Sequence, residues 1–347
     1  MKRLLFIVYC TIIFTLAHSQ DLTVNDFISF TSFPYQKFSD YVSKKGFIAV
    51  SIISRNDTIV YTYDNYNYRK HTAADSIQRN VVMYTYNRGW SFLYETASAE
   101  EYARIETELK AKGFLYTNKP GVSDLLFQKN DLAVHVSQRK ADTSQLYDFI
   151  IEKRILPALK DIHFAEDLLS FNSHENLEYV FGKSNVKKDI YYFSEKEINK
   201  CSVLYPNTSR QVIFIWDDQD NNYKLSYLLF GGSLQTKSAI TNAPVITESS
   251  WTLANGLKPG MNLAELTQMN GGDISFFGKR SEFEGMIVPG NKGELNFRQA
   301  GVLLSCLNCD NSALLDKQVV SANEAIEQNK KIFVLSIILS PEAHASR

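Results

Sequence analysis

The sequence predicts an α+β protein with antiparallel sheets and with helices packed on one face of each sheet. Three observations support this prediction. Runs of β-branched and aromatic residues outnumber the helical patterns. Short turns rich in Asn, Asp and Gly join consecutive runs, as they do in β-hairpins. Amphipathic helices end at glycine and lead into strands, which predicts two domains, each made of two helix-then-strands units.

Length and composition limit the class of protein. The chain has 347 residues, of which 44% are hydrophobic, so it is too apolar for a disordered chain. With 37 basic and 38 acidic residues, nucleic acid is not an expected partner. Four cysteines are too few for a disulfide-framed miniprotein. The length predicts two domains, which we place at residues 20–160 and 161–347 after a signal peptide at residues 1–19.

The first residues have the pattern of a cleavable secretory signal peptide. Lys2 and Arg3 precede an apolar run at residues 4–16, which is shorter than the roughly 20 residues of a membrane-spanning helix. Small residues at Ala17 and Ser19 predict cleavage before Gln20. We therefore expect a secreted or periplasmic protein with no transmembrane segment after cleavage. An uncleaved N-terminal anchor is the alternative.

The first domain is expected to alternate helices with hairpins. The junction Lys45-Gly46-Phe47, at the end of one helix, is repeated as Lys112-Gly113-Phe114 at the end of the next. Ser98 begins that second helix with a capping box, in which Glu101 reaches back to the Ser98 amide. Residues 146–159 have the spacing of a further helix. The expected strands cover residues 47–53, 58–63, 80–86, 90–96, 125–128 and 132–138.

The second domain contains segments that match one another at a nearly constant offset, as an internal duplication would leave them. The matching pairs are Asn176-Leu177 with Asn262-Leu263, residues 189–193 with 273–277, and residues 203–206 with 286–289. A chance match of a few identities is the alternative. Strands at residues 211–216 and 223–230 form the clearest hairpin, and a helix at 320–329 precedes a last strand at 332–339.

Part of the second domain resembles a known group of sequences. Trp251, the helix start Gly260-Met261-Asn262-Leu263-Ala264-Glu265-Leu266 and the turn Asn270-Gly271 resemble a segment of uncharacterised secreted bacterial proteins. The order of a glycine, a short helix and then strands is also similar to the α+β repeats of β-lactamase-inhibitor-like proteins and of a small outer-membrane assembly lipoprotein. The resemblance covers about half of the chain and implies binding or an envelope role. Residues 278–283 stand where that group has an aromatic-Asp-Tyr cluster, so no site is carried over.

Known chemical motifs are incomplete in this sequence. Residues 231–238 approach a phosphate-binding loop, but Thr236 replaces its second glycine and no helix follows. Asp218, Asp220 and Asn222 have calcium-loop spacing without the required Gly and Glu, which favours an acidic hairpin turn. Neither a Gly-x-Ser-x-Gly elbow nor a His-x-x-x-His pair occurs. We therefore expect no catalytic residue, no metal and no cofactor.

The cysteines of the mature chain have several interpretations. Cys306 and Cys309 have the spacing of a redox pair, but Asp310 beside them disfavours a thiolate. In an exported protein the pair predicts a local disulfide. A bridge from Cys201 to either of them, with one thiol left over, is the alternative.

An aromatic surface in the first domain is the most distinctive candidate for binding. Strand alternation places Tyr61 and Tyr63 on one face, and Tyr84 and Tyr86 on one face of the next hairpin. Large amphipathic rings of this kind suit contacts with protein or sugar. The alternative is that they cover the core of the domain. The candidate binding residues are Tyr61, Tyr63, Tyr66, Tyr84, Tyr86 and Trp90.

Taken together, these patterns predict a secreted or periplasmic binding or interaction protein without catalytic activity. A protein or a glycan is the expected partner. The sequence leaves two alternatives open. One is an envelope or extracellular hydrolase, because carboxylates are plentiful and nothing in the sequence selects two of them. The other is a structural component of the envelope.

Overall fold

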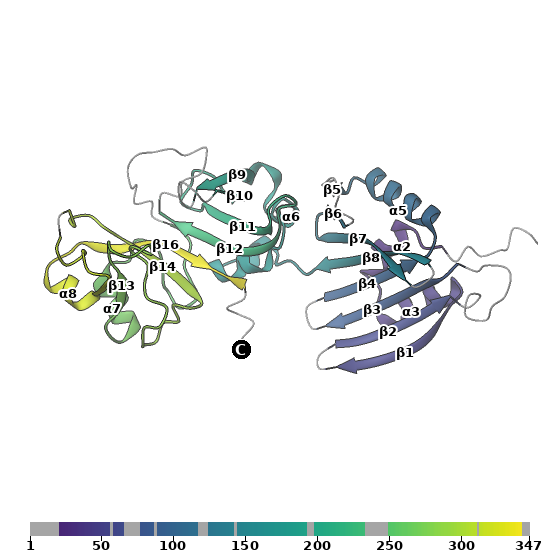
Figure 1. The fold of residues 1–347 in the computed structure, drawn as a ribbon, viewed down its shortest axis with the longest axis horizontal. Helices are drawn as coiled ribbons and strands as arrows, with labels where there is room; N and C mark the ends of the chain where they lie inside the picture. The colour runs from purple at the N-terminus through teal and green to yellow at the C-terminus, as the bar shows by residue number, and fades with distance from the viewer. Residues whose placement is uncertain are drawn as a thin grey trace, which may run out of the picture. The chain divides into compact units, whose positions relative to one another are not determined.

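The computed structural model describes residues 21–55, 58–65, 77–86, 89–116, 124–141, 144–192, 198–232, 249–310 and 312–341. The predicted signal peptide therefore lies outside the described residues. The chain divides after Ile155 into two compact units, an N-terminal and a C-terminal one. Antiparallel sheets of eight and six strands and a small two-stranded sheet confirm the predicted α+β class (Figure 1). Within the described ranges, no helix is both long and apolar enough to cross a membrane.

In its described residues, the N-terminal unit is one eight-stranded sheet with three helices. Its helices are α2 (Val24–Phe30), α3 (Tyr35–Lys44) and α5 (Ala99–Ala111). Its strands are β1 (Phe47–Arg55), β2 (Thr58–Asn65), β3 (Arg79–Tyr86), β4 (Gly89–Thr96), β5 (Leu115–Tyr116), β6 (Leu125–Lys129), β7 (Leu132–Ala141) and β8 (Ser144–Arg154). The strand order β1-β2-β3-β4-β8-β7-β6-β5 joins two four-stranded meanders at β4 and β8 (Figure 1).

Both long helices of this unit end in the same way. Gly46 after α3 and Gly113 after α5 have φ of 91° and 76°, which a residue with a Cβ adopts only with strain. The phenylalanine after each glycine, Phe47 or Phe114, is buried. The repeated Lys-Gly-Phe junction thus stops each helix and turns the chain into the next strand.

Two local predictions for this unit are wrong. Residues 146–159 do not form the predicted helix, because residues 146–154 belong to β8, which lies between β4 and β7. This central strand has apolar residues on both faces, and that pattern imitates helical spacing. Ser98 caps α5 as predicted, by accepting from the Glu101 amide at 3.2 Å. The Glu101 side chain, however, turns inward to Arg79 and does not complete the capping box.

The core of the N-terminal unit lies between the helices and one face of the sheet. Tyr63, Met83, Phe92 and Phe149 are buried there by strand alternation. The helices contribute Phe27, Phe30, Phe38, Val42, Ile105 and Leu109 to the same cluster. Side chains at the intervening positions, such as Tyr84, lie on the opposite face of the sheet.

The C-terminal unit is a six-stranded sheet with short helices and a small second sheet. Its helical elements are η1 (Leu159–Asp161), η2 (Ala165–Ser170), α6 (His174–Phe181), η3 (Lys183–Asn185), α7 (Leu263–Asn270) and α8 (Ala322–Glu327). Its strands are β9 (Val186–Tyr192), β10 (Ile198–Leu204), β11 (Val212–Asp218), β12 (Tyr223–Gly231), β13 (Ser275–Phe277), β14 (Ala300–Cys306), β15 (Val319–Ser321) and β16 (Ile332–Leu339). The large sheet has the order β14-β16-β12-β11-β10-β9, and β13 pairs with β15.

The segments that suggested a duplication take different positions in this unit. Asn262 is the N-cap of α7 and forms a capping box with Glu265. Asn176 instead lies in the first turn of α6, whose N-cap is Ser173. Residues 186–192 form an edge strand of the large sheet, whereas residues 275–277 belong to the small sheet.

Candidate functional site

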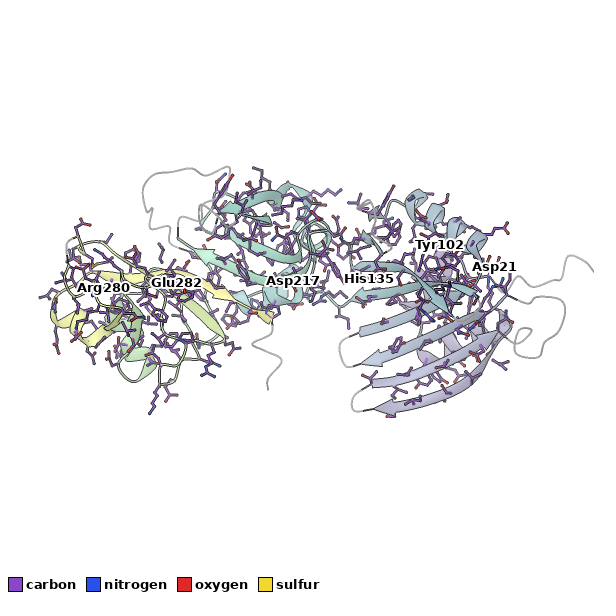
Figure 2. The ribbon with its side chains drawn as sticks, in the orientation of Figure 1. Asp21, Tyr102, His135, Asp217, Arg280 and Glu282 are labelled. Carbon is purple, nitrogen blue, oxygen red and sulfur yellow. A yellow bond between two sulfur atoms is a disulfide. The ribbon has the colours of Figure 1, made fainter. Side chains whose placement is uncertain are left out.

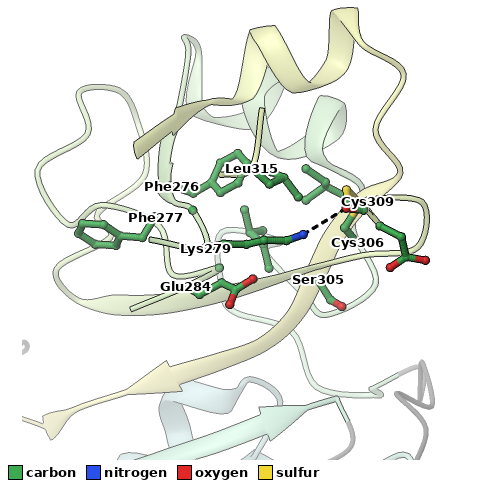
Figure 3. A pocket seen from close by; sticks show the side chains of 13 residues that line it. Phe276, Phe277, Lys279, Glu284, Ser305, Cys306, Cys309 and Leu315 are labelled. Carbon is green, nitrogen blue, oxygen red and sulfur yellow. Dashed lines mark hydrogen bonds between the residues drawn. A yellow bond between two sulfur atoms is a disulfide. The ribbon is translucent and has the colours of Figure 1, made fainter. Parts of the chain in front are cut away.

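A pocket of about 350 Å³ in the C-terminal unit brings several side chains together (Figure 3). This volume lies in the range of small-molecule sites. The pocket is built where the loop after β13 meets the end of β14 and the start of β16. Phe276, Leu304, Leu315 and Ile332 form its apolar lining, and each of them is at least nine-tenths buried.

Short backbone contacts fix the loop that carries the polar side chains of the pocket. The Gly285 amide donates to the Phe277 carbonyl at 2.8 Å, and the Leu304 amide donates to the Gly285 carbonyl at 2.8 Å. At Gly278, a Cβ would lie 2.3 Å from the carbonyl oxygen of Lys317, so only glycine fits this close approach. Residues 278–285 are therefore tied to β13, to β14 and to the segment before β15.

Charged groups of both signs line the pocket. Lys279 is exposed, and among the described residues its ammonium has one long contact, 3.5 Å to the Cys309 carbonyl oxygen, so it can donate to a ligand. Glu284 and Asp310 also line the pocket, and neither forms an ion pair within the described part of the chain. Figure 3 shows Lys279 extending across the pocket toward Cys309, with Glu284 on the side nearer its stem. Arg280 and Glu282 belong to the same loop (Figure 2).

A disulfide forms part of the pocket wall. Cys306, at the end of β14, is joined to Cys309, with 5.7 Å between their Cα atoms. Cys201 takes no part in this bridge and is fully buried in β10. Burial, and secondarily the charge of Asp189, raise the pKa of the Cys201 thiol to about 12, so it stays protonated and unreactive.

The predicted aromatic residues do not form one surface. Tyr63 is 1% exposed, which corrects its assignment as a contact residue and places it in the core under α3. Tyr61 lies on the same face and stacks on Tyr35, with ring centroids 4.2 Å apart. Tyr84 lies on the opposite face of the sheet. Tyr66 is outside the described residues, as are the side chains of Tyr86 and Trp90.

Tyr84 lies near a cluster of charged residues that the sequence did not indicate. Glu95 and Asp148 are register partners on β4 and β8. Arg139 contacts both carboxylates, with 3.0 Å between its Nε and Asp148 Oδ2. Burial raises the pKa of Glu95, against the opposing effect of Arg139, and burial followed by Asp148 raises that of Tyr84. Because Arg139 already occupies the space between the carboxylates, we interpret this cluster as structural.

A second unexpected cluster contains serine, histidine and a carboxylate. His174 Nδ1 lies 2.9 Å from Ser202 Oγ, and its Nε2 lies 3.3 Å from Glu178 Oε1. A carboxylate only accepts, so Nε2 carries the proton and Ser202 donates to Nδ1. Trp216 Nε1 also donates to Ser202 Oγ, at 3.0 Å. Ser202 is 0% exposed, so no substrate reaches this hydroxyl, and the cluster does not support a hydrolase.

The incomplete motifs show no ligand geometry where they are described. In the acidic turn, Asp218 accepts from the Asn221 amide at 3.2 Å, and Asp220 pairs with Lys200 at 2.6 Å. The structure's described residues contain no cluster of three or more His, Cys, Asp or Glu able to hold a metal ion. Residues 233–238 of the phosphate-loop pattern lie outside the described residues.

Comparison with known proteins assigns no family to this chain. No protein-family model matches it, and no curated protein is significantly similar to it.

Proposed function

We propose that the protein is an exported, non-catalytic binding protein that holds a small molecule in the pocket of its C-terminal unit. The observation that carries this proposal is the combination of an apolar lining with charged groups that lack ion-pair partners in the described chain. Concave sites with an apolar lining and a few polar groups are typical of ligand binding. The predicted signal peptide supports export, and a disulfide is favoured in an oxidising compartment.

The charges define the chemistry of the ligand. Lys279 offers an ammonium to an anionic group, and Glu284 and Asp310 offer carboxylates to a cationic group. Between them, Phe276, Leu304, Leu315 and Ile332 offer an apolar surface. A small zwitterion with an apolar or soft body, such as an amino acid or a short peptide, matches all three features. This proposal replaces the glycan or protein surface expected from the tyrosines as the main binding site.

We also infer that the N-terminal unit arose by doubling of a helix followed by four strands. The two glycine junctions and the two meanders that meet at β4 and β8 support this inference. In this interpretation the N-terminal unit is a scaffold or a surface for a protein partner. A structural role in the envelope would use that unit, independently of the pocket.

Titration of the purified mature protein tests the proposed function. We expect zwitterionic dipeptides with apolar side chains to bind, and their acetylated, amidated counterparts to bind about three- to tenfold more weakly, because Lys279, Glu284 and Asp310 are exposed and each lost ion pair to such a side chain costs up to about 1 kcal/mol. Ser305→Trp, which fills the pocket, and Lys279→Met should both weaken binding. Lys292→Met is the control, because Lys292 is exposed in the same unit and does not line the pocket. Equal binding by all four proteins, or by charged and neutral probes, would refute the proposal.

A further inference from the structure

The disulfide in the pocket wall is poorly explained by stability alone. Cys306 and Cys309 are three positions apart in sequence. A bridge that closes such a short loop removes little freedom from the unfolded chain compared with a bridge across a long loop. Both residues nevertheless line the pocket together with Lys279 (Figure 3). The position of the bridge therefore suggests chemistry with the molecule in the pocket.

The loop that carries the two cysteines is held in place without the sulfur bond. The Leu307 amide donates to the Lys331 carbonyl at 3.0 Å. The Asn308 side chain donates to the Asn329 carbonyl at 3.0 Å and accepts from the Lys331 amide at 2.7 Å. Because these contacts do not use the sulfurs, we expect the loop to keep its place against the segment before β16 when the bridge opens. The two sulfurs then stay close enough for the bridge to close again.

The surroundings distinguish the two sulfurs. Cys306 is partly exposed, whereas Cys309 is 8% exposed, so an incoming thiol reaches Cys306 more easily. The Lys279 ammonium lies against the Cys309 backbone, where a positive charge favours a thiolate. Glu284 and Asp310 also line the pocket, and their negative charges disfavour a thiolate at Cys309. Stabilisation of a Cys309 thiolate therefore depends on Lys279.

We propose that the pocket captures thiol-bearing zwitterions, such as a cysteine-containing peptide, by thiol–disulfide exchange at Cys306. This inference rests on the proposed binding function and specifies its ligand. The ligand thiolate attacks Cys306 Sγ, and a new S–S bond forms as the bond between Cys306 and Cys309 breaks. The electron pair of the broken bond leaves on Cys309 Sγ as a thiolate beside Lys279, and the proton of the ligand thiol goes to solvent. No net oxidation occurs, and attack by Cys309 on the mixed disulfide reverses the step.

The test follows the reaction of the oxidised, folded protein with glutathione as the probe, by acid quenching, alkylation and peptide mass spectrometry. We expect exchange without denaturant, with glutathione on Cys306 and the alkyl group on Cys309. Lys279→Met should slow the exchange at least about fivefold, because the leaving thiolate loses its cation. Lys279→Arg should keep most of the rate, and Lys292→Met should keep all of it.

Three results would overturn the inference. They are a bridge that opens only after unfolding, glutathione on Cys309, and equal rates for Lys279→Met and Lys292→Met. The outcome is separable from that of the binding proposal. If dipeptides without a thiol bind but the bridge does not exchange, only the thiol inference fails. If the bridge exchanges with glutathione but no dipeptide without a thiol binds, the proposed zwitterion site fails.

Discussion

Replacing Arg79 by Met is expected to destabilise the N-terminal unit by about 3–5 kcal/mol, because it leaves a buried carboxylate without its cation. Arg79 and Glu101 pair with side chains that are 4% and 6% exposed. Tyr94 and Thr96 also donate to Glu101, at 2.7 and 2.9 Å. Burial acts to raise the pKa of Glu101, but the hydrogen bonds of Arg79 and Tyr94 outweigh it and lower the pKa below its usual value.

Urea unfolding of the full chain, followed by hydrogen exchange of residues in β3, β4 and α5, measures this effect. Arg104→Met is the matched control, because Arg104 forms a partly exposed pair with Glu108 one turn away on α5. We expect the control to cost less than about 1 kcal/mol. A loss below about 1 kcal/mol for Arg79→Met would show that the buried pair does not organise this unit.

Acidification is expected to destabilise the C-terminal unit through His174. Burial and the nearby Lys188 lower the pKa of His174 from its usual 6.5 to about 4, although Glu178 acts in the opposite direction. Between these values the unfolded chain binds a proton that the folded protein does not. Stability therefore falls as the pH drops from 6.5 to 4, by about 3 kcal/mol in total, and this contribution is constant above pH 7.

Unfolding of wild type and His174→Gln at a series of pH values, monitored by tryptophan fluorescence, separates this residue from the other titrating groups. Trp216 reports directly, because its indole bonds to the same serine as His174. We expect His174→Gln to lack the slope between pH 6.5 and 4. The control His163→Gln, at an exposed histidine, should keep it. If stability changes with pH in the same way in wild type and His174→Gln, the pH dependence does not come from His174.

Local sequence patterns predicted most of the secondary structure, because hairpins and helix ends depend on neighbouring residues. The Lys-Gly-Phe junctions identified two helix ends, since the positive φ that they need favours glycine. The spacing of apolar residues did not identify β8 as a strand. Both faces of β8 carry apolar residues, so the usual alternation of a strand is hidden. The spacing also could not show that α3 covers the face of β2 that carries Tyr63.

The candidate site was only partly visible in the sequence. The Cys306 and Cys309 spacing indicated a local bridge, and residues 278–283 differed from the group that the segment resembles. The two cysteines and the first two residues of that segment, Gly278 and Lys279, line the same pocket. Their meeting depends on the way in which β13, β14 and β16 are brought together, and no local pattern encodes this. The His174 cluster was missed for the same reason, because Ser202 and Trp216 come from different strands.

Hydrogen exchange of the full chain, with and without the tightest-binding dipeptide, tests the central claim most directly, because it locates the ligand. We expect protection in peptides that cover residues 276–285 and 304–310, and no change in the eight-stranded sheet. Ser305→Trp should abolish that protection, whereas Lys292→Met should retain it. Protection of the β1–β4 strands, with residues 276–285 and 304–310 unchanged, would contradict the account and move the binding site to the tyrosine-bearing sheet.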